Sequence, residues 1–193
     1  MEGKFLDKIS SSFELDLPSD LETLEQYVEF IVPRIQTWSE DLWEEKFYVG
    51  KRWKEIRDTD TYHETVLHMF MPFDEKAEGN EYMVSIDGDV TKGTWKYLKD
   101  SNTFIVEYGG KSSLFDLVFL NGDFFILKKH GDQARKGKQK YFVYGNEKST
   151  SKLEWRNAME KLYNIYRENS RFSIWLFVII GIIIFVLYYS FSI

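Results

Sequence analysis

The sequence of 193 residues contains no cysteine, three prolines and three histidines. Without cysteine the chain has no disulfide framework, no thiolate metal site and no cysteine nucleophile. It also lacks the G-x-S-x-G elbow of hydrolases, a phosphate-binding loop and the ligand spacing of zinc sites. Aromatic residues, by contrast, make up 18% of the chain, more ring surface than a disordered chain could bury. The sequence therefore predicts a folded protein with few candidate catalytic residues.

Long apolar runs are absent except at the C-terminus, where residues 172–193 contain no charged side chain over 22 positions. As a helix this segment is about 33 Å long, enough to cross the hydrocarbon of a bilayer. Interfacial aromatic residues are expected at its two ends, and a glycine at mid-span allows close helix contact: Trp175, Gly181, Tyr188 and Tyr189. We expect a transmembrane helix here rather than a buried core helix.

Flanking charge predicts the orientation of this helix. Basic residues precede the span and none follows it: Lys152, Arg156, Lys161, Arg167 and Arg171. The positive-inside rule then places the N-terminal domain in the cytoplasm. Residues 1–20 lack the apolar run of a secretory signal. The expected protein is a tail-anchored, single-pass membrane protein.

Residues 1–45 are predicted to form an acidic helical segment. They hold 12 Asp and Glu against 3 Lys and Arg, a local charge of −9. Ser19 and Glu22 match a capping box, and apolar residues follow at helical spacing as far as Trp38. Pro33 is expected to kink or split this helix near Val32.

Residues 46–145 read as a β-domain, because short runs of β-branched and aromatic residues alternate with Gly, Asp and Asn. We predict strands near 46–57, 63–72, 81–87, 93–98, 103–108, 113–120, 123–129 and 140–145. Asp87-Gly88 and Asn121-Gly122 fit two-residue hairpins, whereas Gly109-Gly110 and 99–102 fit longer ones. Strands so closely spaced must pair antiparallel, and eight of them predict a small barrel or a curled half-barrel.

Residues 146–171 are predicted to form an amphipathic helix. Ser151 and Glu154 match a second capping box, and an apolar face follows. No Gly or Pro separates this helix from the membrane segment. It either continues into that segment or bends at Asn169-Ser170.

The stretch 81–129 carries a G-x-W motif at Gly93-Thr-Trp95, a TFIVE strand and a closing strand at 123–129. These motifs resemble the lipocalin-like small β-domains of bacteria over residues 46–145. The resemblance implies an up-and-down antiparallel barrel, often with an apolar cup. Lipocalins are usually exported, whereas this chain lacks an export signal and adds an anchor. A pleckstrin-homology-like barrel, with seven strands closed by a C-terminal helix, is the alternative.

Two groups of candidate site residues remain after weak motifs are set aside. A basic loop could contact anionic lipid headgroups: Lys128, Lys129, Arg135, Lys136, Lys138 and Lys140. Aromatic residues are expected inside the barrel, as a filled core or an apolar ligand pocket: Trp53, Trp95, Phe104, Phe119 and Phe125. The loop has no interleaved aromatic residue, so nucleic acid is not the expected partner.

The histidines and acidic residues suggest no catalytic or metal site. His63 and His68 are expected on opposite faces of one strand, and Asp87-Gly88-Asp89 lacks the further ligands of a calcium loop. We therefore expect no cofactor, no metal and no enzymatic activity. The leading hypothesis is a membrane-held β-domain that binds or scaffolds a protein partner. The alternatives are a membrane-tethered carrier or sensor of a hydrophobic ligand and, least favoured, a membrane-bound enzyme.

Overall fold

The computed structural model describes residues 17–59, 64–74, 79–98, 101–131 and 139–191 of the chain. By their internal contacts the residues divide into two units. Residues 20–159 form the larger unit, which contains every strand that the structure describes. The boundary between the units falls within the last helix, because the chain from Glu160 onward belongs to the second unit.

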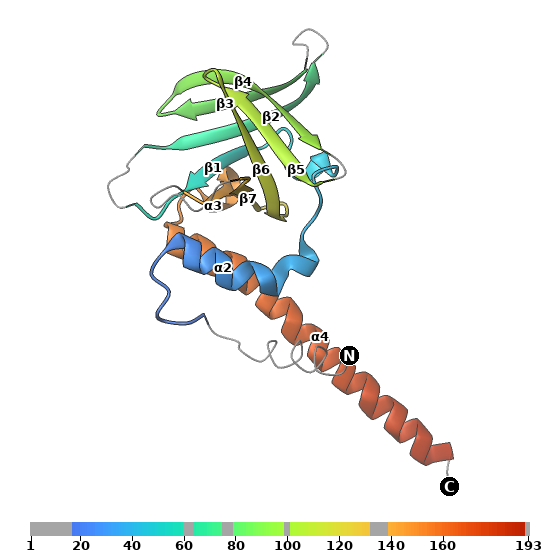
Figure 1. Ribbon diagram of the computed structural model, residues 1–193. Helices are drawn as coiled ribbons and strands as arrows, with labels where there is room; N and C mark the ends of the chain where they lie inside the picture. The colour runs from blue at the N-terminus through green and yellow to red at the C-terminus, as the bar shows by residue number, and fades with distance from the viewer. Residues whose placement is uncertain (1–16, 60–63, 75–78, 99–100, 132–138, 192–193) are drawn as a thin grey trace. The chain divides into compact units, whose positions relative to one another are not determined.

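Eight antiparallel strands close into a barrel, in which each strand pairs with its neighbours in the sequence and β1 pairs with β8 (Figure 1). This confirms the predicted antiparallel barrel, closed rather than a half-barrel, and the strand number differs from the seven of a pleckstrin-homology barrel. The strands are β1 (Arg52–Ile56), β2 (Val66–Asp74), β3 (Gly79–Ile86), β4 (Asp89–Leu98), β5 (Thr103–Tyr108), β6 (Lys111–Leu120), β7 (Phe124–Lys129) and β8 (Tyr141–Asn146).

The two-residue hairpin at Asp87-Gly88 is confirmed, with φ of 49° and 100°. Gly109-Gly110 also forms a two-residue turn, with φ of 58° and 73°, because Tyr108 pairs directly with Lys111. The prediction of a longer connection there was wrong. Two adjacent glycines accept positive φ at both central positions, which is what the tight turn requires.

The predicted two-residue hairpin at Asn121-Gly122 was also wrong. β6 ends at Leu120 and β7 begins at Phe124, so the connection has one residue more. The Asn121 side-chain oxygen accepts hydrogen bonds from the backbone N–H groups of Asp123 and Phe124, at 2.9 and 2.7 Å. This side-chain turn replaces the tight backbone turn, as asparagine commonly does.

Alternate residues of the strands point into the barrel and form one core cluster. Tyr48 lies among its rings, stacked on Phe125 with centroids 5.4 Å apart. The edge or face of Tyr48 also meets Phe70, Trp95 and Phe104 at 5.4–6.2 Å. The Tyr48 hydroxyl donates a hydrogen bond to the Leu42 carbonyl at 2.9 Å. The segment before β1 thus places the Tyr48 side chain inside the barrel, where its ring helps to fill the interior.

The inward position of Tyr48 explains where the first strand begins. A strand was predicted from residue 46, but Glu45–Phe47 forms a short 3₁₀ turn, η2, and β1 begins at Arg52. The turn directs Tyr48 inward, and the indole N–H of Trp53 donates to the Tyr48 carbonyl at 2.9 Å. A second 3₁₀ turn, η1 (Gln36–Trp38), precedes this segment.

Helix α2 (Leu24–Ile35) begins later than predicted. Its N-cap is Thr23, which forms a capping box with Gln26, so the prediction of a cap at Ser19 and Glu22 was wrong. Asp58 also accepts a hydrogen bond from the Leu24 N–H at 2.7 Å. Two partners for the first N–H groups fix the start of the helix at Leu24. Pro33 lies inside the helix, which ends two residues later at Ile35 rather than near Val32.

The outer face of β6, β7 and β8 is also apolar and buried. Phe119, Ile126 and Val143 are each 0% exposed but do not belong to the interior cluster. Phe119 pairs with Ile126, and Ile126 alternates with the inward Phe125 and Leu127. α2 lies beside this part of the barrel (Figure 1). This face therefore needs a covering layer, and the buried stripe of α2 fits that role.

The C-terminal part of the chain is helical but differs from the prediction at its start. Ser151 caps the C-terminus of a short helix, α3 (Glu147–Thr150), because its N–H donates to the Glu147 carbonyl. The longer helix α4 (Trp155–Phe191) therefore begins four residues after the predicted capping box, and it continues through Asn169 and Ser170. Over the described residues, no helix combines the length and apolar character of a candidate membrane span.

The glycine of the G-x-W motif is required by close packing of two strands. A Cβ atom at Gly93 would lie 2.1 Å from the backbone oxygen of Glu107 and 2.7 Å from Cβ of Tyr108. Gly93→Ala must therefore separate β4 from β5, and we expect the free energy of unfolding to fall by about 2 kcal/mol. Urea denaturation of the full chain in detergent measures this loss.

Gly122→Ala is the matched control, because a Cβ at Gly122 meets no atom within 4 Å. Its free energy of unfolding should stay within about 0.5 kcal/mol of the parent chain. Equal stability of the two variants would contradict the close approach of β4 and β5 at Gly93.

Candidate functional site

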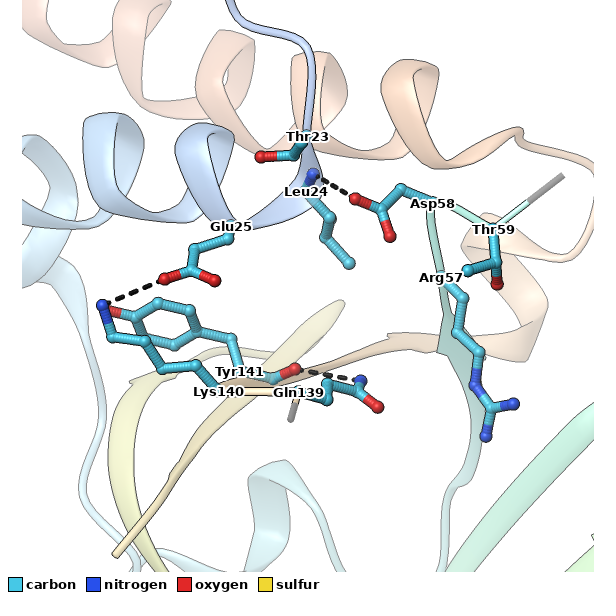
Figure 2. A pocket seen from close by; sticks show the side chains of 9 residues that line it. All are labelled: Thr23, Leu24, Glu25, Arg57, Asp58, Thr59, Gln139, Lys140 and Tyr141. Carbon is cyan, nitrogen blue, oxygen red and sulfur yellow. Dashed lines mark hydrogen bonds and ion pairs between the residues drawn. The ribbon is translucent and has the colours of Figure 1, made fainter. Parts of the chain in front are cut away.

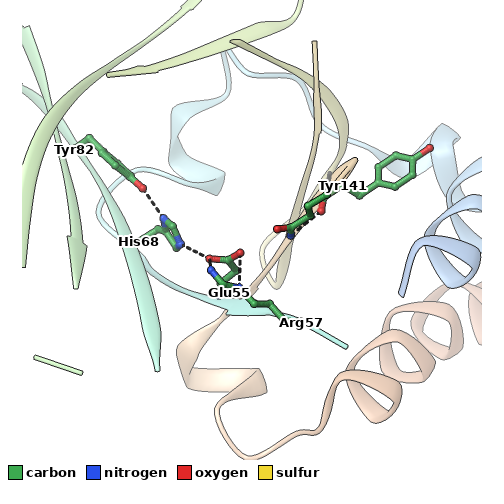
Figure 3. Close-up of polar contacts among 6 residues, drawn as sticks. Glu55, Arg57, His68, Tyr82 and Tyr141 are labelled. Carbon is green, nitrogen blue, oxygen red and sulfur yellow. Dashed lines mark hydrogen bonds and ion pairs between the residues drawn. The ribbon is translucent and has the colours of Figure 1, made fainter. Parts of the chain in front are cut away.

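The barrel holds a chain of hydrogen-bonded polar side chains, of which three are buried and the last, Arg57, is partly exposed (Figure 3). The hydroxyl oxygen of Tyr82 lies 2.5 Å from Nδ1 of His68, and Nε2 of His68 lies 3.2 Å from a carboxylate oxygen of Glu55. Arg57 completes the chain with two hydrogen bonds of 2.8 Å, one to each oxygen of Glu55. We call Glu55, Arg57, His68 and Tyr82 the buried network.

Strand alternation places these residues together. Trp53 is in the interior cluster, so Glu55, two residues later on β1, points the same way, and Arg57 follows the end of the strand. On β2 the inward residues include Phe70 and therefore His68, and on β3 they include Tyr82. Three strands thus supply the network, and their pairing in one barrel brings its members into contact.

Glu55 is ionised in the folded protein. Burial alone would raise its pKa, but hydrogen bonds and positive charge from His68 and Arg57 lower the pKa to about 2. Nδ1 of His68 contacts the Tyr82 hydroxyl and Nε2 contacts Glu55, so both ring nitrogens have a hydrogen-bonding partner. The network therefore places a carboxylate beside a guanidinium and an imidazole in a mostly apolar barrel.

Two tyrosines confirm how dry this environment is. Burial raises the pKa of Tyr82 and of Tyr144 well above the usual range, and the charge of Glu55 adds to both shifts. The Tyr144 ring packs against the His68 ring with centroids 4.7 Å apart. Both phenols therefore stay protonated at physiological pH.

Two clefts open on either side of the residues that follow β1, and Arg57 lines both. The first, the α2 cleft, has a volume of about 550 Å³ and carries Glu25 and Lys140 on one side and Arg57 and Asp58 on the other (Figure 2). The second, the β2 cleft, has a volume of about 500 Å³ and reaches Glu55. The buried network is therefore connected to the surface through the C-terminal end of β1.

The basic residues predicted to contact lipid are only partly described. Lys140 forms ion pairs with Glu25, at 3.2 Å, and with Glu29, and these hydrogen bonds raise its pKa. The acidic N-terminal helix thus already neutralises this residue. Lys128 is half-buried and Lys129 is exposed at the end of β7. The remaining candidates lie outside the described residues: Arg135, Lys136 and Lys138.

The predicted interior residues separate into two groups. Trp53, Trp95, Phe104 and Phe125 lie in the interior cluster. Phe119 is buried on the outer face instead, because the register between β6 and β7 shifts between Leu117 and Phe119 and reverses the alternation. Alternation counted from the sequence alone could not reveal this bulge.

The predicted anchor residues all lie on α4. Gly181 and Tyr188 are exposed in the isolated chain, and the side chains of Trp175 and Tyr189 are outside the described part. None of these positions is tested by a bound lipid or partner helix, so their role as an anchor stays a prediction.

His68 is the one described histidine inside the barrel, where it forms hydrogen bonds with Tyr82 and Glu55. His130 contacts Asp116 at 2.9 Å on the exposed surface, and His63 lies outside the described residues. Within the described ranges, no three His, Asp or Glu side chains are grouped as a metal site would require. Sequence reasoning missed Glu55 and Arg57, whose signal is their two-residue spacing from Trp53.

Comparison with known proteins gives no match to a family model, a curated protein or a solved structure. The closed eight-stranded antiparallel barrel is consistent with the lipocalin-like resemblance of its motifs. A barrel hosts many unrelated functions, so the function has to be argued from the network and the two clefts.

The depressed pKa of Glu55 predicts a specific pH dependence of stability. The pKa of Glu55 is about 2 in the folded protein and 4.5 for an unperturbed glutamate, so its contribution to stability is complete above pH 4.5 and is lost as the pH falls toward 2. Glu55→Gln should therefore lower the free energy of unfolding by about 3 kcal/mol at pH 7. The difference between parent and variant should shrink between pH 4.5 and 2 in denaturation curves.

Glu81→Gln serves as control, because Glu81 pairs with Lys92 at 2.6 Å on the surface. An exposed pair contributes little, so this variant should differ from the parent by less than about 1 kcal/mol at either pH. If Glu55→Gln were as stable as Glu81→Gln at pH 7, the network would not be holding a buried carboxylate.

Proposed function

We propose that this protein is a membrane-anchored, non-enzymatic binding protein that presents its β-barrel domain to a protein partner. The support for the anchor is the sequence of 172–193, 22 residues without a charged side chain. Basic residues before this segment favour a cytoplasmic position for the barrel. The protein would act by holding its partner at the membrane surface.

The filling of the barrel is the observation that carries the choice of a protein partner. Tyr48 occupies the interior between Phe70, Trp95, Phe104 and Phe125, which leaves its end of the barrel packed with rings. The two clefts instead open outward, and polar residues make up most of their lining. Such surfaces suit the polar backbone and side chains of another protein better than an apolar ligand.

The clefts also have mixed charge. The α2 cleft contains Glu25 and Asp58 together with Arg57 and Lys140. Balanced charges of this kind give orientation and specificity to a protein contact more than raw affinity. They provide no reason for a simple anion or a purely apolar molecule to bind there.

A carrier or sensor of a hydrophobic ligand is the second candidate, and the buried network favours it. His68, Tyr82 and Glu55 would provide hydrogen-bonding partners for the polar head of an amphipathic molecule. The lipocalin-like motifs are in line with such a role. Anionic lipid contact by Lys128 and Lys129 would fit either function.

Cross-linking of the full chain in native membranes tests the proposal. The parent protein should sediment with membranes and cross-link through barrel lysines to one recurrent protein. Ile182→Arg combined with Ile183→Arg places two charges at mid-span, each disfavouring insertion by about 3 kcal/mol. This variant should move to the soluble fraction, and its cross-link to a membrane-held partner should be lost.

Ile182→Leu combined with Ile183→Leu is the control and should behave as the parent does. If the arginine variant still sedimented with membranes, 172–193 would not be the anchor. Recovery of the chain without any recurrent cross-linked protein would contradict the binding role. A lipid mass retained in native mass spectrometry, with no protein cross-link, would favour the carrier.

A further inference from the structure

The pairing of β1 with β2 stops early, although β1 continues. The paired residues are Arg52 with Met69, Trp53 with His68 and Lys54 with Leu67. On its other side β1 stays paired with β8 as far as Ile56. β2 likewise is paired with β3 from Val66 onward. Beyond Lys54 and Leu67, β1 is therefore paired only with β8, and β2 is paired only with β3.

The missing pairs follow from the register. An antiparallel ladder advances one residue on each strand in opposite directions, so the next pairs would be Glu55 with Val66, Ile56 with Thr65 and Arg57 with Glu64. All six of these residues line the β2 cleft. The cleft is thus the open continuation of the β1–β2 ladder, bordered by two edges of a sheet that is otherwise closed.

Open sheet edges favour the addition of a further strand. Thr65 exchanges hydrogen bonds with Asp87 on the β3 side, so by alternation the N–H and C=O groups of Glu64 and Val66 face the cleft, where they can pair with an extended peptide. The volume of about 500 Å³ is room for a short extended segment rather than a folded element. Leu153 and Trp155 add apolar surface at the side of the cleft, where a small side chain of such a segment could pack.

The charged side chains of the β2 cleft indicate which side chains the bound segment should have. Arg57 is held on Glu55 by two hydrogen bonds, and the ammonium of Lys54 donates to the Ser151 carbonyl at 3.0 Å. Glu64 and Glu154 are exposed in the same cleft. Among the described residues, no ion pair involves either of them. The cleft lining carries two positive side chains, Lys54 and Arg57, and three negative ones, so its net charge is −1.

We propose that the β2 cleft binds an extended, lysine- or arginine-bearing segment of the partner protein by strand addition. The backbone of the segment pairs with the cleft-facing groups at the ends of β1 and β2, and its basic side chain meets Glu64 and Glu154. This inference rests on the proposed role in protein binding and names the chemistry of the partner. It assigns the buried network a positioning role, since Arg57 and Glu55 fix the β1 edge.

A seven-residue peptide of alternating lysine and valine, labelled with fluorescein, is the probe. Fluorescence anisotropy with the full chain in detergent should show saturable binding, and the matching glutamate–valine peptide should not bind. Glu64→Gln combined with Glu154→Gln should weaken binding about tenfold, because two exposed charge pairs are lost. A lysine–valine peptide methylated on alternate backbone nitrogens should also bind at least about tenfold more weakly, because it cannot pair along one edge.

Asp89→Asn combined with Glu107→Gln is the control, since these exposed acidic residues lie outside the cleft. It should bind the peptide as the parent does. Failure of the lysine–valine peptide to bind overturns the inference, as do equal losses in the control and full binding of the methylated peptide. If cross-linking in membranes still finds a partner in that case, the binding function stands and only this site is wrong.

Discussion

The arrangement of the candidate site depends on the pairing of β1, which is longer with β8 than with β2. The strand closes the barrel through four pairs with β8 but contributes only three pairs to β2. Closure fixes which of its side chains point inward, so Trp53 joins the aromatic core and Glu55 enters the same interior. The shortfall on the other side leaves a cleft at the point where the chain leaves the strand. One short strand therefore positions both the buried network and the proposed binding edge.

The two ends of the interior have different physical characters. Around Tyr48 the rings pack edge to face and stacked, which excludes water and stabilises the barrel by apolar burial. Beyond them Glu55 is buried, and burial of a lone carboxylate would be strongly unfavourable. Arg57 and His68 offset that cost through direct hydrogen bonds. Because removal of one member takes a hydrogen-bond partner from its neighbour, the network also restricts movement of the β1 end.

Much of the barrel could be predicted from the sequence, because its strands are short apolar runs separated by turn residues. Asp87-Gly88 determined its hairpin by local chemistry alone. The helix starts were less predictable: Ser19 and Ser151 match capping boxes, but Thr23 and Asp58 cap α2, and Ser151 ends α3. A local motif marks where a helix is able to begin, and tertiary partners decide between competing positions.

The candidate site could not be predicted from the sequence, and the reason is different. His68 and Tyr82 lie 13 and 27 residues from Glu55, so only the strand register reveals that they meet. The open part of the β1–β2 ladder likewise has no local signature, and the bulge that turns Phe119 outward shifts the alternation by one residue. Long-range pairing is a property of the whole barrel and not of any window of sequence.

Hydrogen exchange along β1 and β2 tests the central claim most directly. In the free protein, the backbone amides of Glu55 and Val66, which face the open part of the ladder, should exchange faster than those of Trp53 and His68, where the ladder is formed. Binding of a basic extended segment should slow exchange at Glu55 and Val66 and leave Trp53 and His68 unchanged. Slow exchange of Glu55 and Val66 without any partner, or no slowing when the segment binds, would contradict an open sheet edge as the binding site.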